Sequence, residues 1–295
     1  MESKVKHKRA EQRFGWPWGV IPAALFFLVF FCGGLLQAIW FSFLPDGDGH
    51  QGIGWAYREL ASPDFLHSLG VTVGMSAAVA LFCGVMGLGA AILLTRPAGW
   101  RQKWYLLFQF PMALPHLMAA YLLSQMLWQS GWLSRLAYHL GWIDEMEQFP
   151  VLTQDAWGVG VLMAYAWKEI PFMILLLVPF LLRLQDQWEE TARSLGASEG
   201  QILRWVILPL LWPAWVGGMW ILFAFVLGAY EIPALMAGTF PGWVPVRAWQ
   251  EYTMFGPERR AVAIAMNLVL LVVALTVGLL LLHLQRVWYG RGRRI

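Results

Sequence analysis

Six long apolar runs are the feature of this sequence that most limits its fold. They lie at about residues 18–43, 67–95, 104–128, 157–182, 206–230 and 261–285. A helix of about 20 residues crosses the roughly 30 Å hydrocarbon core of a bilayer, so each run is long enough to span it once. Because 59% of the residues are hydrophobic and 13% are charged, one water-soluble core could not bury this much apolar surface. The sequence therefore predicts an all-α membrane protein with six transmembrane helices.

The distribution of basic residues predicts the orientation of these helices. If the N-terminus is cytoplasmic, fifteen Lys and Arg residues lie in the inside segments and five lie in the outside segments. The inside segments are then 1–17, 96–103, 183–205 and 286–295. Short cytoplasmic segments carry such an excess of basic residues, so we expect both termini in the cytoplasm. The net charge of +3 follows from this topology and does not indicate a nucleic-acid partner.

The predicted organisation is one membrane domain with basic ends. Residues 1–17 form a basic cytoplasmic N-terminus, and 18–64 form the first transmembrane helix and an outside loop. Residues 65–285 form a core with five transmembrane helices, and 286–295 form a basic cytoplasmic tail.

The second apolar run is rich in Gly and Ala. Small side chains let helices approach closely in lipid, so this helix is predicted either in the bundle interior or at a contact between subunits. The sequence leaves both positions open.

Motifs for catalysis are missing from the sequence. None of the five lysines follows a glycine, so the chain has no G-x-x-x-x-G-K-[ST] loop for the phosphates of ATP. The six histidines show no paired spacing typical of metal ligands, and no G-x-S-x-G motif occurs. We therefore expect no catalytic residue, no metal site and no cofactor in this chain.

The inside segment 183–205 has the pattern of two short helices joined by a turn. Ala192 and Leu195 recur at helical spacing, and Gly196 stands where the end of a helix favours a left-handed residue. Ser198 and Gln201 match a capping box, which marks the start of a second helix that enters the membrane.

This segment resembles the loop of permease subunits in bacterial binding-protein-dependent ABC importers of type I. Their loop has the pattern E-A-A, three residues, G, nine residues, I-x-L-P. The corresponding residues here are Glu190, Thr191, Ala192, Gly196, Val206, Leu208 and Pro209. Both spacings are kept, while Thr191 replaces Ala and Val206 replaces Ile.

The resemblance extends over about residues 65–285. The segments 111–115, 167–172 and 231–235 are similar to the branch that moves spermidine and putrescine, ferric iron, thiamine, phosphonates and similar solutes.

The resemblance implies a non-catalytic transmembrane permease subunit of an ATP-driven solute importer. In this family the loop carries a coupling helix, which docks on a separate ATPase subunit that binds ATP and Mg. The residues implied in this coupling are Glu190, Thr191, Ala192, Gly196, Leu208 and Pro209. Further implied partners are a second permease, identical or paralogous, an extracytoplasmic solute-binding protein and the lipid bilayer. The implied location is the bacterial cytoplasmic (inner) membrane.

Four polar residues are candidates for the solute path. Lys168 and Glu169 lie near the middle of the fourth run, where a charge is energetically costly and needs a partner, a cavity or a path. Neighbours on a helix point about 100° apart, so each is expected to have its own partner, in either a path or a structural ion pair. His116 fits an interior histidine or a solute ligand. Glu231 fits either the mouth of a path or the cap of a turn.

Two other classes of function are alternatives to an ATP-driven importer. A secondary transporter or channel without an ATPase is compatible with six spans and with charges in the membrane, but it would have no use for the loop motif. An intramembrane enzyme would need a catalytic constellation, which the sequence does not contain.

Overall fold

The computed structural model describes residues 18–45, 52–95, 105 and 107–292, and within these ranges the chain forms helices and no strands. From the N-terminus, the elements are η1 (Trp18–Val20), α1 (Ile21–Phe27), η2 (Leu28–Cys32), α2 (Gly33–Phe43), α3 (Trp55–Glu59), α4 (Pro63–Thr95), α6 (Phe110–Ala113), α7 (His116–Leu127), α8 (Trp132–His139), η3 (Met146–Gln148), α9 (Val159–Leu184), η4 (Gln185–Glu189), α10 (Glu190–Ser194), α11 (Glu199–Ile202), η5 (Leu203–Ile207), α12 (Leu208–Gly228), α13 (Glu231–Met236), α14 (Val244–Thr253), η6 (Pro257–Arg259) and α15 (Arg260–Gly292).

Five helical stretches of the described residues are long and apolar enough to cross a membrane. They are Ile21–Phe43, Pro63–Thr95, Val159–Leu184, Glu199–Gly228 and Pro257–Val287. They correspond to five of the six predicted spans, and they confirm an all-α membrane protein.

The predicted third span at 104–128 is not a continuous helix. The structure divides it into α6 and α7, with an extended residue, Leu114, between them (φ −83°, ψ 136°). Pro115 explains the break, because proline has no N–H to donate and it disfavours helical backbone in the residue before it. Within the described residues, five continuous spans therefore replace the six that the sequence predicts; 96–104 and 106 lie outside those residues.

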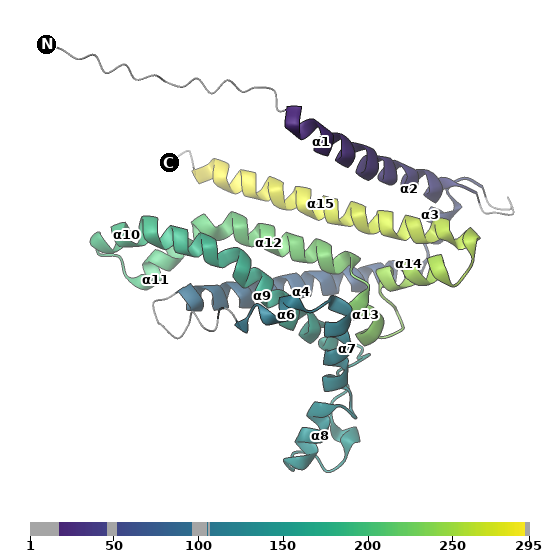
Figure 1. The fold of residues 1–295 in the computed structure, drawn as a ribbon, viewed down its shortest axis with the longest axis horizontal. Helices are drawn as coiled ribbons and strands as arrows, with labels where there is room; N and C mark the ends of the chain where they lie inside the picture. The colour runs from purple at the N-terminus through teal and green to yellow at the C-terminus, as the bar shows by residue number, and fades with distance from the viewer. Residues whose placement is uncertain (1–17, 46–51, 96–104, 106, 293–295) are drawn as a thin grey trace.

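Helix α4 is the centre of the bundle and packs against α9 and α12 (Figure 1). A Cβ atom on Gly87 would lie 2.3 Å from Met173 Cβ, so only glycine allows α4 and α9 to approach this closely. Gly84, also on α4, accepts a hydrogen bond at its carbonyl from the Trp215 indole of α12 at 2.8 Å. This face of α4 therefore lies in the bundle interior.

The opposite face of α4 remains open. Gly70, Gly74 and Gly89 have no atom within 4 Å of a Cβ position. For this face, the subunit contact suggested by the sequence stays a prediction.

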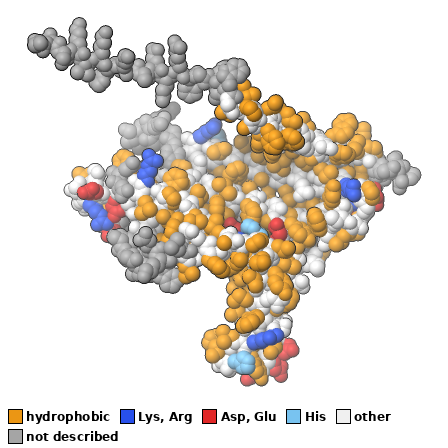
Figure 2. Space-filling model, in the orientation of Figure 1, with side chains coloured by type: hydrophobic (Ala, Val, Ile, Leu, Met, Phe, Trp, Pro, Cys, Tyr) orange, Lys and Arg blue, Asp and Glu red, His pale blue; other side chains and the backbone are white. Residues whose placement is uncertain are grey.

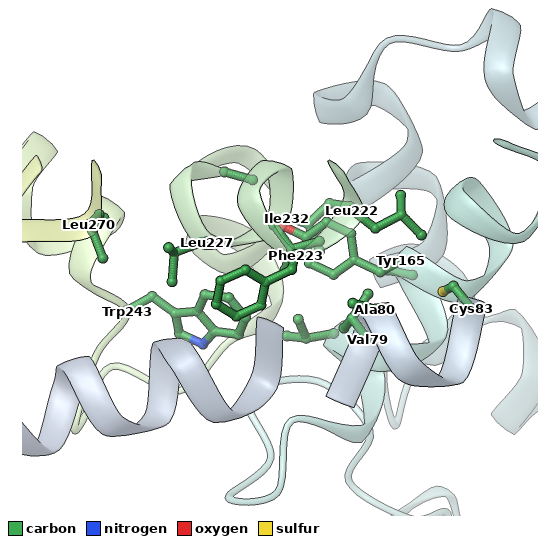
Figure 3. Close-up of a cluster of buried hydrophobic side chains, with 14 of the residues drawn as sticks. Val79, Ala80, Cys83, Tyr165, Leu222, Phe223, Leu227, Ile232, Trp243 and Leu270 are labelled. Carbon is green, nitrogen blue, oxygen red and sulfur yellow. The ribbon is translucent and has the colours of Figure 1, made fainter. Parts of the chain in front are cut away.

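A core of buried side chains draws on α4, α9, α12, α13 and α15 (Figure 3). Its side chains include Val79 of α4, Tyr165 of α9, Phe223 of α12, Ile232 of α13 and Trp243, all of which are buried. Since lipid is as apolar as these side chains, close packing rather than exclusion of water holds them together.

The first span hardly contributes to this core. None of its 18 most apolar residues is buried, and it contacts the bundle through α15. In Figure 1 it lies along one edge of the bundle, beside α15. Its apolar surface is therefore left for lipid or for another subunit.

An ionic contact fixes α3, the short helix that follows the first span, to the bundle. The Arg259 guanidinium donates hydrogen bonds to both carboxylate oxygens of Glu59 (2.8 and 2.6 Å) and to both of Glu251 (2.7 and 3.0 Å). This contact joins α3, α14 and η6. At the opposite end of the long helices lie α10 and α11, and the start of α1 and the end of α15 point to that end as well (Figure 1).

Candidate functional site

The segment after α9 forms the predicted helix and turn. The chain passes through η4, a π-helical turn, into α10. Gly196 then adopts the predicted left-handed conformation, with φ of +82°. The Ala197 N–H donates to the Ala192 carbonyl at 3.1 Å, and the Gly196 N–H donates to the Arg193 carbonyl at 2.9 Å. These two hydrogen bonds form a Schellman motif, which satisfies carbonyl groups at the end of α10.

The second helix begins with the predicted capping box. The Ser198 N–H donates to the Gln201 side-chain oxygen at 2.8 Å, and the Ser198 side chain accepts from the Gln201 N–H. This reciprocal pair fixes the start of α11. From there the chain returns to the membrane through the π-helical turn η5 and α12.

An arginine connects the two halves of this loop. The Arg193 guanidinium lies 2.5 Å from a carboxylate oxygen of Glu189 in η4 and 3.3 Å from one of Glu199 in α11. The hydrogen bonds that Arg193 donates to the Glu189 carboxylate raise the pKa of Arg193, which therefore stays charged. Exposed ion pairs contribute little stability, so we infer that the two pairs of Arg193 mainly fix the position of α10 relative to α11.

The loop presents an exposed edge that contains both charge and apolar surface. Glu190 and Thr191 are exposed, while Ala192 is half-buried. Leu195 is 83% exposed at the end of α10, and Trp205 of η5 is 70% exposed. Large exposed apolar side chains on a short polar segment are typical of a surface that another protein covers.

The last two predicted coupling residues lie apart from this edge. Leu208 and Pro209 form the first turn of α12 and are half-buried. The chain is already helical before Pro209, so its missing N–H follows directly on the π-helical turn η5. These two residues therefore position the start of α12, whereas Glu190 to Gly196 form the exposed loop.

The turns next to the loop are π-helical on both sides. The turns η4 and η5 contact each other at the end of the bundle that carries α10 and α11. Such turns occur frequently at functional sites, and here they join the loop to two long helices.

Lys168 is directed into the chain itself. Its ammonium group donates to the carbonyl oxygens of Pro111 at 3.0 Å and Leu114 at 2.7 Å. These carbonyls belong to the break between α6 and α7, where Pro115 offers no N–H. With 4% of its surface exposed, Lys168 serves to satisfy this break.

Glu169 has a different partner, as the sequence predicts. Its carboxylate lies 3.3 Å from His116 Nε2, and the exposed fractions of the two side chains are 9% and 33%. The His116 ring also packs against Phe225, with 5.0 Å between the ring centroids. Figure 2 shows a histidine beside acidic side chains within a largely hydrophobic face, near the base of the projecting α7 and α8.

Glu231 lies on a helix that packs against the elements carrying this pair, since it begins α13, which contacts both α7 and α9. On α9, one turn before Glu169, Tyr165 is fully buried, and its hydroxyl has no hydrogen-bond partner within the described chain. We call His116, Tyr165, Glu169 and Glu231 the polar cluster.

The Glu231 carboxylate is half-buried and makes no hydrogen bond to the described residues. The alternative that Glu231 caps a turn through its side chain therefore has no support in the structure.

Sequence reasoning missed two members of this site. Tyr165 lies four residues before Glu169, so helical periodicity places both on one face of α9 and could have found it. Phe225 carries no such signal, because it stands in an apolar run like its neighbours.

These helices and the capped loop define an integral membrane protein. The chain belongs to the family of binding-protein-dependent transport system inner membrane components, whose family model matches residues 70–288.

Named relatives include sulfate permeases. The chain is 30% identical to the probable sulfate transport system permease protein cysT of Chlorella vulgaris over 185 residues, which cover 62% of this chain and 66% of that protein. It is 30% identical to the sulfate transport system permease protein CysT of Salmonella typhimurium over 189 residues, covering 62% and 64%. The match thus spans just under two thirds of the length of these relatives. The chain is also 26% identical to the inner membrane ABC transporter permease protein YdcU of Escherichia coli over 228 residues, which cover 73% of this chain and 72% of that protein.

Solved structures show the same fold. A bacterial ABC transporter involved in the import of the acidic polysaccharide alginate matches with a TM-score of 0.75 at 19% identity, covering 91% of this chain and 93% of that chain. The alginate transporter in complex with its alginate pentasaccharide-bound periplasmic protein matches with the same TM-score and covers 91% and 92%. The structure thus confirms the predicted permease fold.

Proposed function

We propose that this chain is a transmembrane permease subunit of an ATP-driven solute importer, and that it couples to a separate ATPase through the loop 183–205. The observation that carries the proposal is the capped helix–turn–helix at the inner end of the bundle. Its Schellman motif and capping box hold Glu190 and Leu195 on an exposed edge that the chain itself does not cover. A loop that only joins two spans does not need this order.

The proposal assigns ATP hydrolysis to the partner. ATP and Mg would be bound by the ATPase, and we assign no catalytic residue and no cofactor to this chain. ATP binding would close the paired ATPases and change the relative position of two permease subunits by rigid-body movement, which alternates access to the path.

A second permease, identical or paralogous, would complete the path. Two surfaces support it, namely the unburied first span and the open face of α4 at Gly70, Gly74 and Gly89. An extracytoplasmic solute-binding protein would deliver the solute to the outer end.

The proposed location is the bacterial cytoplasmic membrane, with both termini in the cytoplasm. The excess of basic residues in the inside segments supports this orientation. It places α10 and α11 on the side where ATP is available.

Within the membrane, we place the solute path beside the polar cluster. His116 and Glu231 keep part of their surface exposed at the junction of α7, α9 and α13. Ionisable groups at this depth are rare unless they meet a path or a partner.

The experiment is co-purification with the products of the neighbouring genes in mild detergent. We expect an ATPase to co-purify with the wild-type chain and to be lost from Glu190→Lys, which reverses the charge on the exposed edge. Glu145→Lys is the matched control, because Glu145 is also exposed but lies beyond α8, away from the loop. A chain that transports solute in liposomes without an ATPase would contradict the proposal and indicate a secondary transporter.

A further inference from the structure

A cavity of about 510 Å³ lies between α4 and two irregular segments, and we call it the loop cavity. The segments are 154–158, which precedes α9, and 237–243, which precedes α14. In Figure 1, α14 lies toward the end of the bundle opposite α10 and α11. Sites for small molecules have volumes of about 300–1,000 Å³, so the loop cavity is large enough for a small solute.

The loop cavity reaches a depth at which lipid does not tolerate irregular backbone. Helix α4 has 33 residues, so it is about 50 Å long and extends about 10 Å beyond each side of the hydrocarbon core. Met75 of α4 lines the cavity about 18 Å from the start of the helix, and it meets Gly158 there. Irregular backbone at this depth is stable only where protein buries it or where it lines a water-filled cavity. Because Ala156 and Trp157 are exposed, we take the loop cavity as water-filled.

Both irregular segments are held in place by hydrogen bonds. The Ser68 hydroxyl of α4 donates to the Pro241 carbonyl, and the Gln154 N–H donates to the Met236 carbonyl at 2.7 Å. Gln154 has φ of +57°, the only positive value among the described residues other than glycine. Residues held in such sparsely populated conformations gather at ligand sites. The walls of the cavity are therefore formed before a ligand binds.

The loop cavity offers no free charge to a ligand. Asp155 is the only ionisable residue among the described residues that line it. Its carboxylate accepts hydrogen bonds from the N–H groups of Trp157 at 3.2 Å, Val159 at 2.8 Å and Gly160 at 3.3 Å. A charged solute that leaves water needs an opposite charge as partner, so this cavity favours an uncharged one.

Neutral polar groups in the loop cavity lack partners. Trp243 is 4% exposed, yet its indole N–H makes no hydrogen bond to the described residues. In that part of the chain, only Ser134 and Tyr165 have an unpaired polar side-chain atom that is fully enclosed, so the indole nitrogen keeps access to the cavity. The side chains of Gln154 and Thr239 also line the cavity without a partner among the described residues. These groups can bind the hydroxyl oxygens of a ligand.

Two aromatic rings stand at the rim of the same cavity. Trp157 is 85% exposed and Phe240 is 74% exposed. Large exposed apolar side chains around a polar hollow are typical of a ligand-binding groove. Their flat faces fit the C–H surface of a ring or a short carbon chain.

We propose that the loop cavity binds an uncharged, hydroxylated solute, a sugar or a polyol, before it enters the transport path. The Trp243 indole and the Gln154 amide bind its hydroxyl groups, and the rings at the rim pack against its carbon atoms. Gly158 is about two helical turns from Tyr165 along α9, so the cavity leads toward the polar cluster. The proposal rests on the proposed function and names the solute class of its path, which differs from the sulfate in the names of two relatives.

The test measures access to a cysteine in the wall of the loop cavity. Ala156→Cys is made in the complex of this chain with its partners in lipid nanodiscs, because Ala156 is exposed and lines the cavity. Mass spectrometry follows the rate at which a maleimide labels position 156 with glucose, maltose, sorbitol, sodium sulfate or spermidine added. We expect at least one of the three uncharged compounds to slow the labelling several-fold, and sulfate and spermidine to leave it unchanged. Glu145→Cys, exposed beyond α8, is the control that no compound should protect.

A second variant tests the unpaired indole. Trp243→Phe keeps a buried ring and removes the N–H, so protection of position 156 should need several-fold more of the same compound. Trp142→Phe is the matched control, because Trp142 is 76% exposed beyond α8 and should leave protection unchanged.

Three results would overturn the proposal. They are no protection by any uncharged compound, equal protection by sulfate or spermidine, and a thiol at 156 that is unreactive without solute, which would show that another protein covers the cavity. The proposed function is tested separately, since it fails if the complex purifies without an ATPase.

Discussion

The ammonium group of Lys168 donates a hydrogen bond to the main-chain carbonyl of Leu114, with 2.7 Å between nitrogen and oxygen. Leu114 is the extended residue before Pro115, at the break between α6 and α7. A charge within one span thus satisfies the backbone of another span where proline interrupts it. In lipid no water replaces such a partner, so the charge at 168 and the broken helix depend on each other.

Lys168→Met should therefore reduce stability. The substitution leaves the Leu114 carbonyl without a donor and the Pro111 carbonyl with only the Leu114 N–H at 3.4 Å, and a buried group left unsatisfied costs about 1–3 kcal/mol. We expect a lower midpoint of thermal unfolding in detergent. Arg135→Met, at an exposed position on α8, should shift the midpoint little. An unchanged midpoint together with a raised half-saturating solute concentration would instead assign Lys168 to the solute.

Gly87→Ala should weaken the packing of α4 on α9. The new Cβ would lie 2.3 Å from Met173 Cβ, and overpacking of this kind costs about 1–3 kcal/mol. Gly89→Ala is the matched control on the same helix, because it has open space and alanine favours helix. The measurement is thermal unfolding of both variants in detergent. Equal midpoints would show that α4 and α9 are further apart than described.

Gly196→Asp should abolish ATP-driven uptake without preventing insertion. Gly196 has φ of +82° and open space at its Cβ position, so the substitution strains the backbone but meets no neighbour. A negative charge at the end of α10 is also unfavourable for the helix dipole. Gly200→Asp is the control, because it adds the same charge at the start of α11, where that dipole favours it. Membrane fractionation measures insertion, and a transport assay measures ATP-driven uptake. Loss of the Gly196→Asp variant from the membrane fraction would contradict the prediction.

Neighbouring residues on α10 should respond differently to substitution. Thr191→Ala should be neutral, because Thr191 is exposed and accepts the Ser194 hydroxyl through its main-chain carbonyl, which alanine keeps. Ala192→Phe should weaken association with the ATPase by about tenfold, or about 1.4 kcal/mol, since a bulky ring prevents close docking. Titration of purified ATPase measures both affinities. Similar losses from the two variants would show that docking does not depend on the small side chain.

Sequence patterns predict the spans and the loop because their signals are local. Hydropathy over 20 residues finds each long helix, and the glycine and capping residues of the loop act within five positions of one another. The break at Pro115 also has a local cause, but the residues on both sides are apolar, so hydropathy alone predicts one continuous span there.

The polar cluster could not be assembled from sequence alone. His116, Glu169 and Glu231 are far apart in the chain, and their proximity depends on how α7, α9 and α13 pack. The local geometry of α9 does predict that Lys168 and Glu169 have separate partners, and the structure confirms it. That the partners of Lys168 are main-chain carbonyls follows from the broken helix and has no signature in the sequence.

The most direct test of the coupling surface is site-specific photocrosslinking in the membrane. A photoreactive phenylalanine derivative replaces Leu195, which is 83% exposed on the loop, or Trp142, which is 76% exposed beyond α8. The account predicts a covalent adduct with the ATPase subunit from position 195 and none from position 142. An adduct with the ATPase from position 142 would contradict the account. So would the absence of an ATPase adduct from position 195 in a complex that contains the ATPase.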